Sequence, residues 1–397
     1  MRGRELLAEA RRLRGKLVAW RRHLHMYPEP SMEEHETAAF VVERLREIGV
    51  ARVSAGVGGT GVLGLVRGRG SKTVALRADI DALELVEENE VEYRSRRPGL
   101  MHGCGHDAHV ACLLGAAAIL NARRERLRGN VKLIFQPGEE GAGGAARMIE
   151  EGALERPRVA AIAALHVDPD TPAGWVAVRR GFDTAQVDDV TLTVRGKTAH
   201  VAGPHEGADA IAIASQVLIA IQQFVPRRTN PMDRKLIGFG TIEGGTRRNV
   251  LADRVTLEGT IRTIEPEGRK AIVNFLKGDL RRLTRALGGR LELKIEEGYP
   301  PLVSDDRVVE VVEAAARAVL GQGRVKELER PGLGGEDFSY FALAGAPAAM
   351  MRLGTRDEKR GFTAPGHNSR FDLDDGRALP IGAAMLAATA MGMLERF

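Results

Sequence analysis

The order of the predicted helices and strands changes near residue 183, and this change constrains the fold more than any other feature of the chain. Before it, amphipathic helical patterns at residues 4–26 and 32–49 alternate with apolar strand patterns such as 72–81 and 131–137. This alternation is typical of an α/β domain whose mostly parallel sheet is covered by helices. After it, the patterns follow in the order β-α-β-β-α-β, which is the ferredoxin-like arrangement.

The chain therefore divides into a discontinuous first domain and an inserted second domain. We predict that residues 1–182 and 297–397 form one α/β domain with a mixed, mostly parallel sheet, and that residues 183–296 form a ferredoxin-like βαββαβ insert. The length of 397 residues agrees with two domains, because single hydrophobic cores stop growing beyond about 250–300 residues.

Charge and hydropathy exclude several classes of protein. The chain carries 58 Lys and Arg residues against 53 Asp and Glu residues, and only 4% of its residues are aromatic. Nucleic-acid binders instead gather cations beside exposed aromatic residues, so we expect no nucleic-acid partner. No run approaches the roughly 18 uninterrupted apolar residues of a membrane span, and the charged N-terminal pattern is unlike a signal peptide. We therefore expect a cytoplasmic protein without a membrane partner.

The stretch MHGCGHDAHVA, residues 101–111, holds three histidines, one cysteine and one aspartate. It precedes and begins a predicted helix, and its glycines permit unusual backbone angles. Cys104 and His106 are therefore candidate metal ligands, with Asp107 as a candidate supporting residue. The only other cysteine is Cys112, so no disulfide framework is expected.

Further candidates follow apolar strand patterns. Glu139 and Glu140 come directly after one such strand, and His166 lies at the end of another. Open α/β sheets build their sites at the carboxyl ends of strands, so we expect these side chains to meet the loop. His367 adds an imidazole from a polar loop near the C-terminus.

These candidates supply more ligands than one ion needs. The set is Cys104, His106, Glu140, His166 and His367. One tetrahedral ion takes three or four ligands, so five fit two divalent metal ions of the kind found in hydrolytic enzymes. Thiolate and imidazole ligands suit zinc, manganese, cobalt or nickel. Glu139 is left as the candidate general base.

The chain resembles the aminoacylase, hippurate hydrolase and auxin-conjugate amidohydrolase family of metallopeptidases. The matching motifs are RRHLHMYPEPSMEEHETAAFV, LRADIDAL, MHGCGHDAHVA, QPGEEGAGGAARMI, GKTAHVAGPHEGADAI, GGTRRNVLAD, GTIRT and GGEDFSYF, in the family's order along nearly the whole chain. The resemblance implies a zinc-aminopeptidase-like catalytic domain. It also implies that the insert acts as a lid and in dimerisation, and hence that the protein is a homodimer or higher homo-oligomer.

The resemblance further implies roles for single residues. Cys104 bridges the two ions, Glu140 and His367 bind one of them, His106 and His166 bind the other, and Glu139 is the base.

In the insert, the resemblance implies that His200 hydrogen-bonds the oxyanion, in its own subunit or in a partner's, and that Asn249 helps it. Arg262 would bind the substrate carboxylate. Asp79 and Asp81 end another apolar strand pattern and suit the orientation of a ligand histidine. Asp107 and Glu336 are further candidates for such supporting roles.

We therefore expect a metal-dependent amidohydrolase that cleaves small N-acyl-L-amino acids into a carboxylic acid and a free amino acid. The same site also suits a dipeptidase or carboxypeptidase. Two alternatives of other classes are a hydrolase that uses Cys104 as its nucleophile and a metal-binding scaffold without turnover. Chelation separates the thiol enzyme from the metalloenzyme, and the pair Glu139 and Glu140 argues against the scaffold, because a scaffold needs no base.

Overall fold

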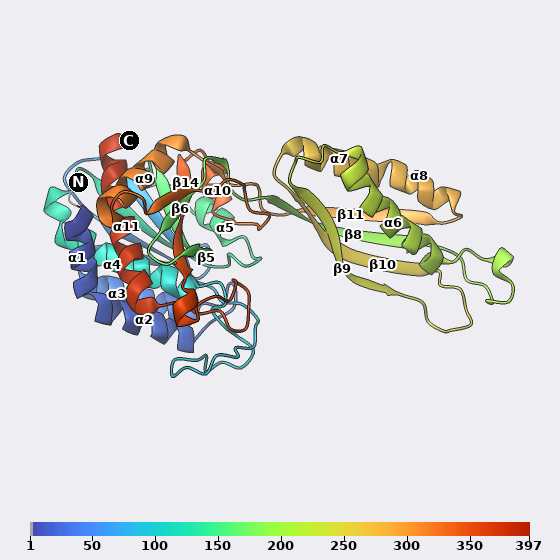
Figure 1. Ribbon diagram of the computed structural model, residues 1–397, viewed down its shortest axis with the longest axis horizontal. Coiled ribbons are helices and arrows are strands. Elements are labelled where there is room, and N and C mark those ends of the chain that lie inside the picture. The colour runs from blue at the N-terminus through green and yellow to red at the C-terminus, as the bar shows by residue number, and fades with distance from the viewer. Residues whose placement is uncertain (1–2) are drawn as a thin grey trace. The chain divides into compact units, whose positions relative to one another are not determined.

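The structure, a computed structural model, describes residues 3–397. The chain folds into two compact units (Figure 1). The first contains the chain up to Asp183 together with Val303–Arg330 and Asp337–Phe397, and the second contains Thr184–Leu302 and Pro331–Glu336. The predicted bounds place residues 297–302 and 331–336 in the first domain, whereas the structure places them in the second unit.

The first unit is built on a mixed eight-stranded sheet. Its strands are β1 (Arg52–Val57), β2 (Gly61–Val66), β3 (Thr73–Asp79), β4 (Asn130–Gln136), β5 (Ile162–Pro172), β6 (Val176–Val178), β13 (Val325–Glu327) and β14 (Ala348–Arg356). They lie in the order β1-β2-β4-β3-β5-β14-β6-β13, and the central strands β4, β3, β5 and β14 are parallel. Every residue of β3 is buried, as expected where both faces of a sheet are covered. The predicted α/β class with a mostly parallel central sheet is confirmed.

Helices and a small second sheet complete the first unit. The helices are α1 (Gly3–Arg12), α2 (Arg14–Met26), α3 (His35–Ile48), α4 (His106–Ala122), α5 (Gly144–Glu150), α9 (Asp306–Leu320), α10 (Ser339–Leu343) and α11 (Asp375–Arg396). β7 (Gly181–Phe182) pairs with β12 (Val303–Ser304). The helical pattern at residues 4–26 forms two consecutive helices, α1 and α2, that meet at Leu13.

The close packing of α4 against α11 fixes the part of the chain that leads into the site. A β-carbon at Gly382 would lie 2.4 Å from Sγ of Cys112, and one at Gly115 would lie 2.8 Å from Cβ of Ala383. Only glycine permits this approach. α4 begins at His106, so its packing holds the loop of the candidate ligands in place.

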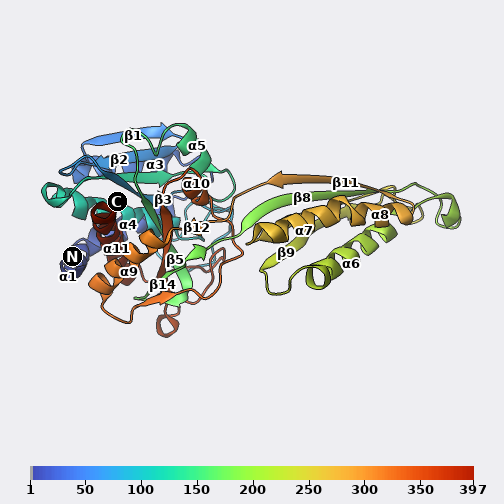
Figure 2. The same cartoon turned by 90° about the horizontal axis from the view of Figure 1, so that it is seen from above.

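The second unit is a four-stranded antiparallel sheet with three helices on one face (Figures 1 and 2). Its elements are β8 (Gln186–Arg195), α6 (Ala210–Arg228), β9 (Lys235–Gly244), β10 (Arg254–Thr263), α7 (Pro266–Lys277), α8 (Asp279–Ala286) and β11 (Arg290–Glu297). The strand order is β11-β8-β10-β9. The elements follow the predicted βαββαβ order, but the second helical segment is divided at Gly278.

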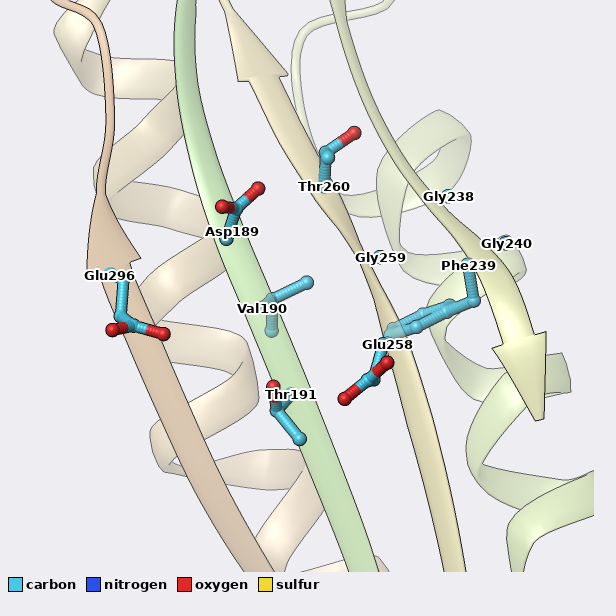
Figure 3. A pocket seen from close by; sticks show the side chains of 10 residues that line it. All are labelled: Asp189, Val190, Thr191, Gly238, Phe239, Gly240, Glu258, Gly259, Thr260 and Glu296. Atoms are coloured by element: carbon cyan, nitrogen blue, oxygen red, sulfur yellow. The ribbon is translucent and has the colours of Figure 1, made fainter. Parts of the chain in front are cut away.

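The sheet of the second unit carries an open hollow of about 690 Å³ (Figure 3). Asp189, Thr191, Glu258, Thr260 and Glu296 supply side chains to it. Glu296 lies directly opposite Asp189 on the neighbouring strand, so the hollow is acidic. None of the groups of potential metal ligands found in residues 3–397 lies there, and the hollow is not the candidate metal site.

Two helices are long and apolar enough to cross a membrane by length and composition alone, α6 and α11. The most apolar part of α11 is 83% buried within the first unit, which is typical of a core helix. α6 buries one face against its sheet and leaves Ile211 and Ile219 exposed.

Candidate metal centre

The candidate site lies at the carboxyl edge of the central parallel strands. β3 is followed by Asp81, β4 is followed by Glu139 and Glu140, and β5 carries His166 in the half that extends beyond its pairing with β3. Because these strands are parallel neighbours, the residues that follow them meet at one edge of the sheet.

The loop before α4 brings Cys104 and His106 to the same edge. Gly105 has a φ of +85°, and a β-carbon there would lie 2.5 Å from Cγ2 of Val167 on β5. Both the left-handed backbone and the close approach therefore require glycine. The loop is held against β5 with its two candidate ligands on either side of this glycine.

Hydrogen bonds to Asp81 set the orientation of His106. Nδ1 of His106 donates to the carbonyl oxygen of Asp81 at 2.9 Å, and Oδ1 of the Asp81 carboxylate lies 3.2 Å from the same nitrogen. The proton on Nδ1 leaves the lone pair on Nε2, which lies 3.7 Å from Oε1 of Glu140. The other carboxylate oxygen of Asp81 accepts from the backbone N–H of Glu140 at 2.9 Å, so one carboxylate positions both candidate ligands.

The turn after β4 holds the two glutamates. The backbone N–H of Gly138 donates to Oε1 of Glu34 at 2.8 Å, which ties the turn to the segment before α3. Glu139 is buried, with 7% of its surface exposed. It forms a group with His106 and Glu140 in which the potential ligand atoms all lie within 4.8 Å of one another.

His166 is oriented from both sides. Its Nδ1 donates to the carbonyl oxygen of Val167 at 2.7 Å, so the lone pair is on Nε2, which lies 3.5 Å from Sγ of Cys104. The backbone N–H of Val167 donates to Nε2 of His109 at 2.8 Å, and Nδ1 of His109 donates to Asp79 at 2.5 Å. Asp79 therefore positions the strand that carries His166 through His109, a residue to which the sequence pattern gave no role.

His367 reaches the site from a strained position. Its φ of +60° lies in the left-handed region, which is costly for a residue other than glycine and is typical of functional sites. Its backbone N–H donates to the carbonyl oxygen of Gly103 at 2.9 Å. Its Nε2 lies 3.4 Å from Oε1 of Glu140.

The candidate ligands form two groups that share one member. Cys104, His106 and His166 form the first, and Cys104, Glu140 and His367 form the second, each with its ligand atoms within 4.8 Å of one another. Nε2 of His106 and Oε1 of Glu140 are buried and make no hydrogen bond within residues 3–397. Buried groups without partners are costly, and a cation beside them removes that cost. The donor set of one thiol, three imidazoles and one carboxylate fits borderline divalent cations.

The electrostatics of the site favour a positive charge. Burial lowers the pKa of His106, but Asp79, Cys104 and the hydrogen bond to Asp81 together raise this pKa well above its usual value. Burial lowers the pKa of His166 and raises the pKa of the Cys104 thiol. The Cys104 thiol therefore needs a cation beside it to become a thiolate, whether it acts as a nucleophile or as a metal ligand.

Asp107 faces α2 and makes its contacts there. Its carboxylate accepts from Nε of Arg21 at 2.8 Å and from Nδ1 of His25 at 2.7 Å. Nε2 of His25 lies 3.2 Å from Glu87. This buried network ties α2 to the start of α4. The sequence pattern did not single out Arg21 and His25, although their spacing of four residues places them on one face of a helix.

His200 and Asn249 lie side by side in the second unit. His200 forms a β-bridge with Val250, and the backbone N–H of Val201 donates to the carbonyl oxygen of Asn249 at 3.1 Å. The N–H of Ala202 donates to Nδ1 of His200 at 3.1 Å. In the neutral ring, the proton is therefore on Nε2, which makes this nitrogen of an exposed side chain a hydrogen-bond donor.

Arg262 lies near the end of β10. Its Nη1 donates to the carbonyl oxygen of Leu333 at 3.0 Å and its Nε to Oγ1 of Thr260 at 3.3 Å. Its Nη2 makes no hydrogen bond in the described part of the chain. Glu336, another predicted supporting residue, is buried at the end of the segment that contains Leu333.

Known proteins resemble the chain over nearly its whole length. The family described as Peptidase family M20/M25/M40 matches residues 75–392. Thermostable carboxypeptidase 1 of Saccharolobus solfataricus is 38% identical, over 98% of this chain and 98% of that protein. N-acetyl-L-cysteine deacetylase of Bacillus subtilis is 36% identical, over 91% of this chain and 85% of that protein. Among solved structures, the YXEP protein of Bacillus subtilis, described as a dinuclear metal binding peptidase from the M20 family, is 31% identical, with a TM-score of 0.82 over 97% of this chain and 99% of that chain.

Proposed function

The chain belongs to peptidase family M20/M25/M40 and is a metal-dependent hydrolase of amide bonds, and we propose that its substrates are small N-acyl-L-amino acids. Hydrolysis releases a carboxylic acid and a free amino acid. The observation that carries the proposal is the pair of ligand groups that share Cys104 beside the buried Glu139. The relative named N-acetyl-L-cysteine deacetylase is named for a compound of this class.

We propose that the five ligands hold two divalent ions. Cys104 is the shared ligand, Glu140 and His367 complete the set for one ion, and His106 and His166 complete the set for the other. Zinc, manganese, cobalt and nickel all suit these donors. The two groups of ligand atoms support this division, and the lone pairs that the hydrogen bonds leave on Nε2 of His106 and His166 make both suitable ligands.

The remaining residues have separate tasks. When bound, the ions polarise the substrate carbonyl and lower the pKa of water. Glu139 accepts the proton of the attacking water and delivers it to the nitrogen of the leaving amine. Nε2 of His200 donates a hydrogen bond to the carbonyl oxygen as it becomes negative, with Asn249 beside it. Arg262 binds the substrate carboxylate through its planar guanidinium group.

A carboxypeptidase is the second candidate, because Thermostable carboxypeptidase 1 is among the relatives. A peptide also presents a free carboxylate next to the amide that is cleaved, so Arg262 would serve both substrates. The two candidates differ in the group on the carbonyl side of the amide, which is a simple acyl group in one and an amino acid in the other.

A substrate panel separates these candidates. We expect the enzyme, reconstituted with zinc or manganese, to hydrolyse acetyl-, benzoyl- or indoleacetyl-amino acids with a kcat/KM at least about tenfold above that for dipeptides, the size of discrimination that a few apolar contacts give. Matched N-acyl amino acid amides, which lack the carboxylate, are the control and should be poor substrates. A preference for dipeptides would favour the carboxypeptidase.

Within the second unit, His200 and Arg262 lie at opposite ends of the sheet. Arg262 pairs with Val187 at the start of β8, whereas His200 follows Arg195 at its end. The eight residue-to-residue steps along the strand from Val187 to Arg195 span about 26 Å, which exceeds the length of a small N-acyl amino acid. We propose that Arg262 acts in its own subunit and His200 in the site of a partner subunit.

The proposed roles predict different kinetic losses. We expect His200→Ala to reduce kcat by about 10²–10³, the usual effect of removing an oxyanion donor. We expect Arg262→Ala mainly to raise KM and to weaken the preference for a free carboxylate. The measurement is steady-state kinetics on the N-acyl amino acid and its amide, together with the metal content. The control is His205→Ala, which alters an exposed histidine in the same loop and should keep normal kinetics.

The proposed action of His200 in a partner subunit has its own test. Mixing His200→Ala protein with Glu139→Gln protein should restore part of the activity, because a heterodimer contains one intact site. Mixtures that stay inactive after subunit exchange, while both variants remain dimeric, would contradict it.

We propose that the second unit also forms the dimer contact. β9 is an edge strand, and Ile211, Ile219 and Ile242 are at least half exposed, as expected where a second copy covers an apolar surface. We further propose a cytoplasmic enzyme of small molecules, with neither nucleic acid nor a membrane as partner.

A further inference from the structure

The first unit has an arginine-rich hollow in addition to the candidate metal centre. It has a volume of about 610 Å³ and lies around the first turn of α11, with α1 and the end of α9 beside it; Figures 1 and 2 show these three helices side by side. Five arginines and a single acidic residue line the hollow: Arg11, Arg14, Arg324, Arg360, Arg377 and Asp374. None of the proposed metal ligands is among the lining residues.

Three of these arginines have no acidic partner within residues 3–397. Arg360 forms an ion pair with Asp374, and Arg377 forms one with Asp357 at 3.0 Å. Arg11, Arg14 and Arg324 form no ion pair there. Like charges that converge from separate parts of the chain repel one another, and a bound anion removes this repulsion.

The start of α11 brings Arg14 to the hollow. Gly376 lies in the first turn of this helix, whose N-cap is Asp374 and whose first turn also carries Asp375. A β-carbon at Gly376 would lie 2.6 Å from Nη2 of Arg14, so the glycine lets this guanidinium group lie directly on the helix start. Arg14 itself belongs to α2, and the two elements jointly present donors to the hollow.

The rest of the lining is apolar. Leu7, Val319, Leu320, Pro380 and Ile381 supply the other side chains. A hollow with guanidinium groups and an apolar wall suits a ligand that has an anionic group and a less polar part. Several arginines around one hollow favour an anion with more than one charge, because each planar fork pairs with two oxygens.

We propose that this hollow binds a small molecule that carries a diphosphate group attached to a ring or another apolar part. The hollow is separate from the hydrolytic site in its residues, so binding there does not depend on the proposed function.

Fluorescence and calorimetry with the full-length protein test the site. The probes are inorganic phosphate, inorganic diphosphate and ADP. The guanidinium carbon of Arg324 lies 5.5 Å from the ring centroid of Trp175, and the chain's other tryptophan, Trp20, is buried in α2. We expect diphosphate to change the Trp175 fluorescence and to bind more tightly than phosphate. We expect ADP to bind more tightly still, through its adenosine part.

The double substitution Arg14→Gln with Arg324→Gln should raise the dissociation constant of diphosphate at least about tenfold. The loss of a single hydrogen bond to a charged group already raises a dissociation constant by about this factor. Both side chains are exposed, so folding should persist. The control, Arg67→Gln with Arg128→Gln, removes the same charge from exposed residues outside the lining set and should leave binding unchanged. Binding that is undetectable at millimolar diphosphate, or that both double variants weaken equally, would overturn the proposal.

Discussion

Treatment with a chelator such as EDTA should abolish hydrolysis of N-acyl amino acids, and dialysis against zinc or manganese should restore it. The reason is the donor set: the ligand atoms of Cys104, His106 and His166 lie within 4.8 Å of one another, and so do those of Cys104, Glu140 and His367. Cys104→Ala removes the one ligand that both groups share. We expect it to lower the metal content from two ions per chain to one or none, and turnover by at least about 10³, because bound ions supply several kcal/mol of transition-state stabilisation.

The control is the other cysteine of the chain. Cys112 is buried in α4 and packs against Gly382, and it belongs to none of the ligand groups in residues 3–397. Cys112→Ala should therefore keep both ions and near-normal turnover. Metal analysis by mass spectrometry and steady-state kinetics measure the two properties separately. A protein that holds no metal and stays active in chelator would instead support Cys104 as a nucleophile.

The layered fold was predictable because the spacing of apolar residues along the sequence indicates which side chains of a strand or helix are buried. Apolar runs such as residues 131–137 become fully covered central strands, and alternating patterns such as 185–196 become strands with one exposed face. The family resemblance and the metal-dependent amidohydrolase activity are likewise confirmed. The segment 331–336 was misplaced because its contacts with the second unit, such as that between Leu333 and Arg262, join residues far apart in the sequence.

The ends of parallel strands allowed the candidate ligands to be predicted as one site. Topology gathers whatever follows such strands at one edge, so Glu140 and His166 could be placed without knowing any side-chain angle. The partners of the supporting residues could not be predicted this way. Asp107 directly follows a candidate ligand, yet a helix turns successive side chains by about 100°, and its carboxylate therefore meets Arg21 and His25.

The second large effect concerns the proposed base. Glu139→Gln keeps the shape and polarity of the side chain and removes its ability to accept a proton. Glu139 is buried beside His106 and Glu140, whereas the carboxylates of Asp337 and Asp107 are already paired with Arg77 and Arg21. We expect kcat to fall by about 10²–10⁴, the usual contribution of general acid–base catalysis, while the metal content remains unchanged.

Two comparison variants make this result specific to proton transfer. Glu140→Gln should lose metal as well as activity, because its carboxylate belongs to a ligand group. Glu150→Gln alters an exposed glutamate at the end of α5 and should change neither property. If Glu139→Gln loses metal in parallel with turnover, Glu139 is a ligand rather than the base. If it keeps near-normal turnover with both ions bound, the attacking water gives its proton to another group. The assignment of Glu139 as base and Glu140 as ligand would then be wrong.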